Sequence, residues 1–181
     1  MDANSRGARW SVILGSAVVG LTVWALPWVA VAQEPASPEA QANFTARYRD
    51  ALTDLWNDKP LEAIDPLYQL VLDGGCSNHK CQLRLAQAYR NIGELDEGHR
   101  WAVAAVERAA NVGISGAEEY NELGLCLFEM AKADPVYLGE SVTAFRESVD
   151  RKKAQGDTYL YNLSQALLAA GEVEEAGAIL S

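Results

Sequence analysis

One phrase of the sequence occurs twice, and this repetition constrains the fold more than any other feature. The first copy consists of Leu85, Ala86, Tyr89, Gly93, Glu94 and Leu95, and the second of Leu163, Ser164, Leu167, Gly171, Glu172 and Val173. Corresponding residues are 78 positions apart, and a looser copy beginning at Leu123-Gly124 lies between them. Self-similarity at periods of tens of residues indicates a repeat architecture, in which each unit buries its apolar face against its neighbours.

From about residue 38 onward, apolar residues recur at steps of three and four, which is typical of helices, and no strand-like alternation interrupts them. Breaks at Asn57-Asp58-Lys59-Pro60, at Gly93 and at Asp134-Pro135 divide the helices. We expect antiparallel helix pairs over residues 38–75, 81–110, 117–154 and 159–181. The predicted fold class is all-α, a short right-handed α-solenoid of about four antiparallel helix pairs.

The repeated residues resemble those of the tetratricopeptide repeat (TPR) family. Its unit places a large and then a small residue early in the first helix, and a small residue in the second helix where the two axes approach. The matching residues are Leu85-Ala86, Leu123-Gly124, Leu163-Ser164, Gly98, Ser141 and Ala176. The copies are spaced by 38 and 40 residues, whereas the family repeats every 34. The first pair matches mainly through Ala51, Ala63 and Leu67.

The resemblance implies that the first helices of successive pairs line a groove for a protein or peptide partner. Its register assigns to this groove Arg84, Gln87, Arg90, Asn91, Asn121, Leu125, Phe128, Tyr161, Asn162, Gln165 and Leu168. Amide side chains can hydrogen-bond an extended peptide backbone, and Arg84 and Arg90 can hold a carboxylate. The alternative is an ordinary polar helix face without a partner.

The first 32 residues have the pattern of a secretory signal peptide. Arg6 and Arg9 precede an apolar stretch, and Pro27 lies shortly before the small-residue cleavage pattern Ala30-Val31-Ala32. The alternative is an uncleaved membrane anchor, because the stretch is just long enough to span a bilayer. We therefore predict a signal peptide over 1–32, a flexible lead-in over 33–40 and a TPR-like helical domain over 41–181. The predicted location is periplasmic or secreted.

Cys76 and Cys81 are separated by four residues between the first and second helix pairs. In an exported protein this spacing favours a disulfide that fixes the angle between the two pairs. The alternative is a thiol-redox or metal-handling site that uses Cys76, His79 and Cys81. His79 is otherwise expected to be an exposed turn residue, and Cys126 a small buried hydrophobe.

No constellation of catalytic residues is recognisable, and no cofactor or metal motif accompanies the repeat. Adjacent carboxylates such as Glu118-Glu119 are expected to lie on solvated helix faces, since neighbours on a helix point in different directions. The net charge of −10 disfavours nucleic acid as a partner, and membrane contact is expected only if the N-terminal segment is kept.

The predicted function is that of a non-catalytic scaffold or adaptor of the cell envelope that binds a protein or peptide. The thiol-redox or metal-handling reading stays open as an alternative. A third reading is a structural homo-dimer subunit joined through its apolar C-terminal end, which lacks the polar outer face that terminal repeats need.

Overall fold

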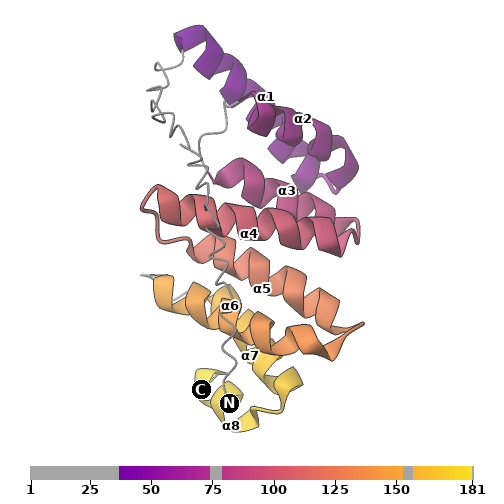
Figure 1. Cartoon of the computed structure of the whole chain (residues 1–181), viewed down its shortest axis with the longest axis vertical. Coiled ribbons are helices and arrows are strands. Elements are labelled where there is room, and N and C mark those ends of the chain that lie inside the picture. The colour runs from indigo at the N-terminus through magenta and orange to yellow at the C-terminus, as the bar shows by residue number, and fades with distance from the viewer. Residues whose placement is uncertain (1–36, 74–78, 153–156, 181) are drawn as a thin grey trace, which may run out of the picture. The chain divides into compact units, whose positions relative to one another are not determined.

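The computed structural model describes residues 37–73, 79–152 and 157–180, and this part of the chain is all helical. Figure 1 shows the helices following one another in chain order. The elements are α1 (Pro38–Trp56), α2 (Pro60–Leu72), α3 (Lys80–Asn91), α4 (Leu95–Asn111), α5 (Ala117–Ala131), the 3₁₀ turn η1 (Pro135–Tyr137), α6 (Leu138–Arg151), α7 (Asp157–Ala170) and α8 (Val173–Leu180).

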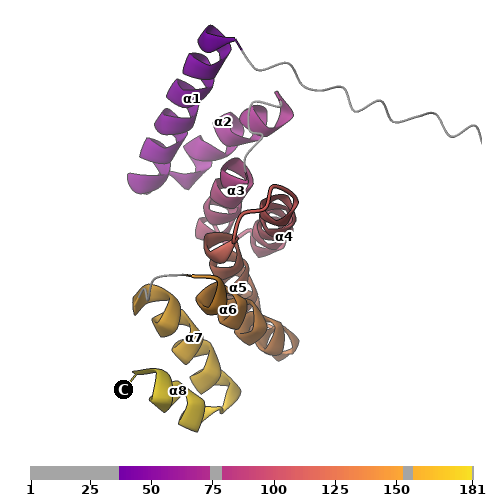
Figure 2. The ribbon, with the colours of Figure 1, turned by 90° about the vertical axis from the view of Figure 1, so that its left-hand side faces the viewer.

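The α-helices form four pairs, α1–α2, α3–α4, α5–α6 and α7–α8, and each helix packs on the next one in the chain (Figure 2). The first helices of neighbouring pairs also touch, so that α3 contacts α1 and α5, and α5 contacts α7. This arrangement confirms the predicted all-α solenoid of helix pairs.

The first helix begins at Pro38, the start expected for the first helix pair. Ser37 caps α1 by accepting a hydrogen bond from the backbone N–H of Ala40 at 3.2 Å, and Pro38 occupies the first turn. A serine cap followed by proline is a strong helix start, because the cap satisfies a free N–H and proline has none to satisfy. The expected lead-in over 33–40 is therefore wrong for residues 38–40, which are helical.

Two residues of the repeated phrase end helices in the same way. Gly93 and Gly171 have φ angles of +83° and +82°, in the left-handed region that favours glycine. Both glycines lie between the two helices of a pair, at the α3–α4 and α7–α8 turns. The matching phrase thus encodes matching turns.

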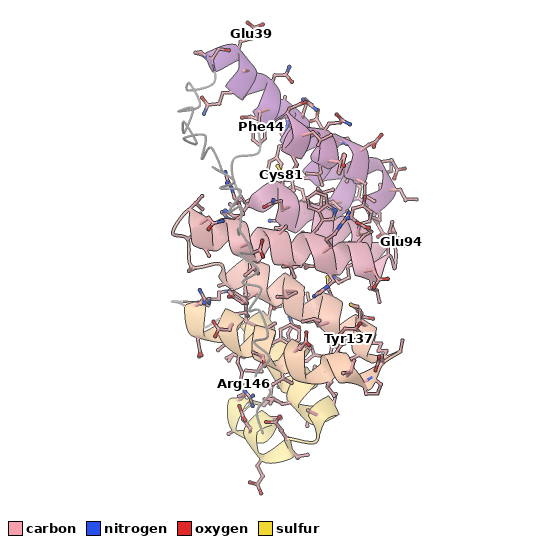
Figure 3. All side chains as sticks on the ribbon, in the orientation of Figure 1. Glu39, Phe44, Cys81, Glu94, Tyr137 and Arg146 are labelled. Atoms are coloured by element: carbon pink, nitrogen blue, oxygen red, sulfur yellow. The ribbon has the colours of Figure 1, made fainter. Side chains whose placement is uncertain are left out.

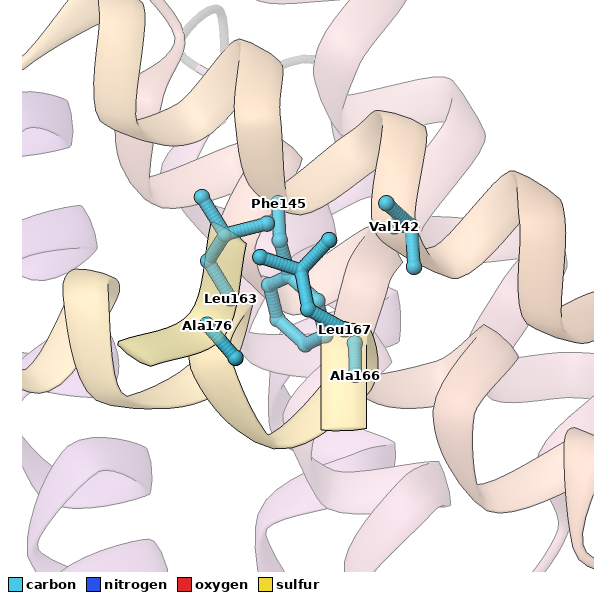
Figure 4. Close-up of a cluster of buried hydrophobic side chains, with 6 residues drawn as sticks. All are labelled: Val142, Phe145, Leu163, Ala166, Leu167 and Ala176. Carbon is cyan, nitrogen blue, oxygen red and sulfur yellow. The ribbon is translucent and has the colours of Figure 1, made fainter. Parts of the chain in front are cut away.

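The core between the third and fourth pairs is built around Phe145, whose ring is fully buried. Figure 4 shows this cluster, which consists of Val142, Phe145, Leu163, Ala166, Leu167 and Ala176. On α5, Gly124 lies against the same ring: a Cβ added there would be 2.6 Å from Cδ1 of Phe145. Ser141 donates a hydrogen bond to the carbonyl oxygen of Gly124 at 3.0 Å. The small residues of the repeat therefore allow close helix approach, as predicted.

A second cluster joins the first and second pairs and consists of Ala51, Ala63, Leu67 and Leu85. Within the second pair, a Cβ on Gly98 would lie 3.2 Å from the backbone nitrogen of Arg90, so α3 and α4 also approach closely. The described helices include none with the length and hydrophobicity needed to cross a bilayer. Residues 1–36, which carry the predicted signal peptide, lie outside the described ranges.

Candidate partner-binding face

The structure brings the predicted groove residues onto adjoining helices. Arg84, Gln87, Arg90 and Asn91 lie on α3, Asn121, Leu125 and Phe128 on α5, and Tyr161, Asn162, Gln165 and Leu168 on α7. We call these eleven residues the first-helix face. Because α3 contacts α5 and α5 contacts α7, the face runs across three successive units.

At the α3–α5 contact the face is held by a buried ion pair. Arg90 donates through Nε to Oε1 of Glu122 at 2.6 Å and through Nη2 to Oε2 at 3.4 Å. The Glu122 side chain is only 2% exposed. Burial raises the pKa of Glu122, and the charge of Arg90 lowers it without offsetting the burial. The guanidinium is thus the counter-charge of a carboxylate that water does not reach.

Arg84 is also paired inside the molecule. Its Nη2 lies 2.9 Å from Oε1 of Glu118 on α5, and its Nη1 donates to Oε1 of Gln87 at 2.7 Å. Arg84 also donates a side-chain hydrogen bond to the hydroxyl oxygen of Tyr48 on α1. Both arginines predicted to hold a partner's carboxylate therefore already hold one from α5.

The α5–α7 contact uses amides in place of charges. Nδ2 of Asn162 donates to Oδ1 of Asn121 at 2.9 Å. Beside this pair Tyr161 is 56% exposed and Leu168 44% exposed, while Phe128 and Gln165 are half-buried. The two halves of the face therefore differ in charge and in the exposure of apolar side chains.

Equivalent positions of the repeat make this difference plain. Five residues after Leu85, Leu123 and Leu163 stand Arg90, Phe128 and Leu168, respectively. One residue before these leucines stand Arg84, Glu122 and Asn162, and each of the three contacts the preceding unit. The repeat register thus decides where a side chain lies, and the residue type decides whether it pairs or stays available.

Sequence reasoning missed a second buried pair, which joins the residue preceding α3 to α5. His79, expected as an exposed turn residue, is 7% exposed in its side chain, and its Nε2 lies 3.1 Å from Oε1 of Glu119, which is 3% exposed. The two atoms are within ion-pair distance but are not aligned as a hydrogen bond. The solvated position expected for Glu119 is also wrong.

The repeat register could have revealed Glu119. It lies four residues before Leu123, as the buried Cys81 lies four residues before Leu85. This inward position outweighs the tendency of carboxylates to stay in water, because the histidine supplies a polar neighbour. No comparable signal marks His79, which precedes α3.

Of the three cysteines in the sequence, Cys81 and Cys126 lie in the described residues, and both are buried. Cys126 is fully buried, as predicted, and burial, together with the neighbouring Glu122, raises the pKa of its thiol to about 12, so it is unreactive at neutral pH. Cys81 is buried at the start of α3. Cys76 lies outside the described residues, so the Cys76–Cys81 disulfide stays a prediction.

Within the described ranges, no three His, Cys, Asp or Glu side chains come together in a way that would hold a metal ion. The alternative site of Cys76, His79 and Cys81 includes a residue outside those ranges. Of its members, His79 faces the carboxylate of Glu119.

Comparison with known proteins bears on the fold. No protein-family model matches the chain, and no curated protein matches it. Among solved structures, the Sgt2 TPR domain from Aspergillus fumigatus is similar, with a TM-score of 0.60 and 19% identity over 78% of this chain and 88% of that one. The nearly identical TPR-like repeats of a Podospora anserina protein described as a kinesin light chain give a TM-score of 0.62 and 21% identity, over 77% and 72%. The fold is therefore that of a TPR-like α-solenoid.

Proposed function

We propose that this protein is a non-catalytic scaffold of the cell envelope that binds a protein or peptide partner on its first-helix face. The observation that carries the proposal is the row of equivalent positions on α3, α5 and α7, which presents amides from the three adjoining helices and exposed apolar side chains from α7. The TPR-like fold supports it, because solenoids of this kind offer extended surfaces to partners.

Rigidity of the face supports the same function. The Arg90–Glu122 and Arg84–Glu118 pairs join α3 to α5, and the Asn162–Asn121 hydrogen bond joins α5 to α7. A surface whose side chains are already held in place loses less conformational entropy when a partner binds. The contacts between units therefore prepare the face for binding.

Export through a signal peptide over residues 1–32, followed by a periplasmic or secreted location, is part of the proposal. The predicted Cys76–Cys81 disulfide would form in such an oxidising compartment. Cell fractionation together with mass spectrometry of the N-terminus tests both points. A mature protein that begins at Gln33 is expected, and one that begins at Met1 would replace the signal peptide with the membrane anchor.

A second candidate is a homo-dimer joined through the last helix pair. Its supporting observation is the exposure of Val173 and Leu180 on α8, at 61% and 59%. Sedimentation of the purified protein over a range of concentrations tests this candidate. A dimer whose dissociation is shifted by Leu180→Ser supports it, and a strict monomer removes it.

Site-specific photo-crosslinking in living cells tests the scaffold proposal. A photoreactive phenylalanine analogue replaces Tyr161 on the face. The matched control carries the analogue at Asp150, an exposed position on α6, which is the second helix of the third pair. We expect a discrete adduct from position 161 that position 150 does not give. Equal patterns from both positions would contradict the assignment of the face.

A further inference from the structure

We infer that the segment of the partner that contacts the first-helix face is uncharged and apolar, and that it binds between α5 and α7 rather than at the arginines. This inference rests on the proposed function and specifies its partner. We call the contacted region the α5–α7 patch, which consists of Asn121, Leu125, Phe128, Tyr161, Gln165 and Leu168.

The arginines are not available to a charged partner. Glu122 is 2% exposed and has Arg90 as its counter-charge. If Arg90 turned to a carboxylate of the partner, Glu122 would be left buried and uncompensated, which is strongly unfavourable. If Arg84 bound a carboxylate of the partner, it would give up its ion pair with Glu118 for an equivalent one. The binding free energy would therefore gain little.

The α5–α7 patch has the geometry of a continuous surface. On α5 its members are spaced by four and three residues, and the spacing on α7 is the same, so each set occupies one side of its helix. The hydrogen bond between Asn121 and Asn162 places the two helices side by side. None of the six residues carries a charge, and the nearby Glu129 is paired with Lys132.

The amide pair provides the polar contacts that an apolar segment needs for its backbone. Asn162 donates to Asn121 through Nδ2, and Asn121 accepts through Oδ1. Nδ2 of Asn121 can therefore still donate to a ligand, and Oδ1 of Asn162 can still accept from one. One donor and one acceptor match the carbonyl and the N–H of a peptide backbone. Tyr161 and Leu168, the two most exposed members, then contact apolar side chains of the partner.

The size of the patch sets the length of the segment. Seven residues of helix span roughly 10 Å, and neighbouring helix axes lie about 8–10 Å apart. An extended peptide rises about 3.3 Å per residue, so about three residues cross the patch. Alternate side chains of an extended chain point the same way, and the expected ligand therefore has apolar residues at alternate positions.

The test uses a random dodecapeptide phage library panned against the purified protein, followed by affinity measurements with the enriched peptides as synthetic fluorescent probes. We expect enriched peptides that lack Asp, Glu, Lys and Arg. Their affinity should fall about tenfold or more in Leu168→Ser and in Tyr161→Ser. It should change by less than about twofold in Arg146→Gln, which removes a charge on α6 outside the first-helix face, and hardly at all between low and high salt. Circular dichroism verifies that each variant keeps its helical content.

The outcomes separate the inference from the proposed function. Enriched acidic peptides whose binding is lost in Arg84→Gln would overturn the inference and leave the scaffold function standing. Apolar peptides that bind Leu168→Ser and Tyr161→Ser as well as the unchanged protein would overturn the location. A library that yields no binding peptide would overturn both the inference and the peptide-binding function.

Discussion

Two junctions of the solenoid occupy the same repeat positions and are built differently. Between the second and third pairs, the buried core residues are small, Ala86, Ala102 and Cys126, and the first helices are joined by the Arg90–Glu122 ion pair. Between the third and fourth pairs, Phe145 fills the core and an uncharged amide pair joins the first helices. The repeat fixes which positions meet, and each junction then has its own sensitivity to packing, charge and pH.

The largest expected effect is at the apolar junction. Phe145→Ala should destabilise the protein by about 3–5 kcal/mol, because the ring is fully buried and the surrounding helices cannot fill the space completely. Urea unfolding followed by circular dichroism measures the loss. Figure 3 labels Arg146, the half-buried residue that follows Phe145 on α6.

Arg146 provides the matched control. It forms surface ion pairs with Glu172 and Glu175 at 2.8 Å, and pairs of this kind contribute about 0–1 kcal/mol. Arg146→Ala should therefore cost far less than Phe145→Ala. Equal losses for the two variants would show that the ring does not hold the junction together.

The next effect concerns the charged junction. Arg90→Gln should cost about 2–3 kcal/mol at pH 7, somewhat below the usual 3–5 for a broken buried pair, because Arg90 itself remains partly exposed. Burial already raises the pKa of Glu122, and removing the arginine raises it further. As the pH falls from 7 towards 4.5, the folded variant therefore takes up a proton before the unfolded chain does. The difference in the free energy of unfolding between Arg90→Gln and the unchanged protein should therefore become smaller over this range.

The double variant Arg90→Gln/Glu122→Gln isolates the cause. It has no buried charge to compensate, so it should be more stable than Arg90→Gln alone at pH 7 and should lose the pH-dependent recovery. Unfolding curves at several pH values supply the measurement. If the double variant were no better than the single one, the unpaired carboxylate could not be the source of the loss.

Close packing at Gly124 gives a third prediction. Gly124→Ala should destabilise by about 1–3 kcal/mol, since the new Cβ would lie 2.6 Å from a ring that has no room to move. Gly139→Ala is the matched control on α6, where an added Cβ meets nothing within 4 Å. There the substitution should stabilise by about 0.5–1 kcal/mol.

A cycle with Phe145→Leu tests this explanation. The smaller side chain leaves room for the methyl group, so the two substitutions together should cost less than the sum of their separate effects. Strict additivity in the unfolding free energies would mean that Gly124 is required for another reason.

The fold could be predicted from the sequence because the repeated residues are those that set helix distance. Large-small pairs such as Leu123-Gly124 indicate where two helix axes approach each other. The structure confirms this, because Phe145 packs against Gly124. Residues 38–40 were assigned to the lead-in because the first turn of α1, which begins at Pro38, carries few apolar residues, and only the Ser37 cap marks it.

The site could be predicted only in part. The register placed Arg84 and Arg90 on the first helices, but their partners Glu118 and Glu122 lie on the next unit, more than thirty residues away. Pairing over such a distance depends on the angle between units, which local spacing does not contain. The burial of His79 depends on the same angle, because its neighbour Glu119 belongs to α5.

The smallest effect tests the uncharged junction. Asn162→Ala removes one neutral hydrogen bond at a half-buried position, and it should cost about 0.5–1.5 kcal/mol. Unlike Arg90→Gln, this loss should be the same at pH 7 and pH 4.5 and at low and high salt, because neither Asn162 nor Asn121 titrates. Urea unfolding under these four conditions is the measurement. A loss that varied with pH would mean that the charges of the α3–α5 contact influence the α5–α7 contact, and the two junctions would then act as one unit.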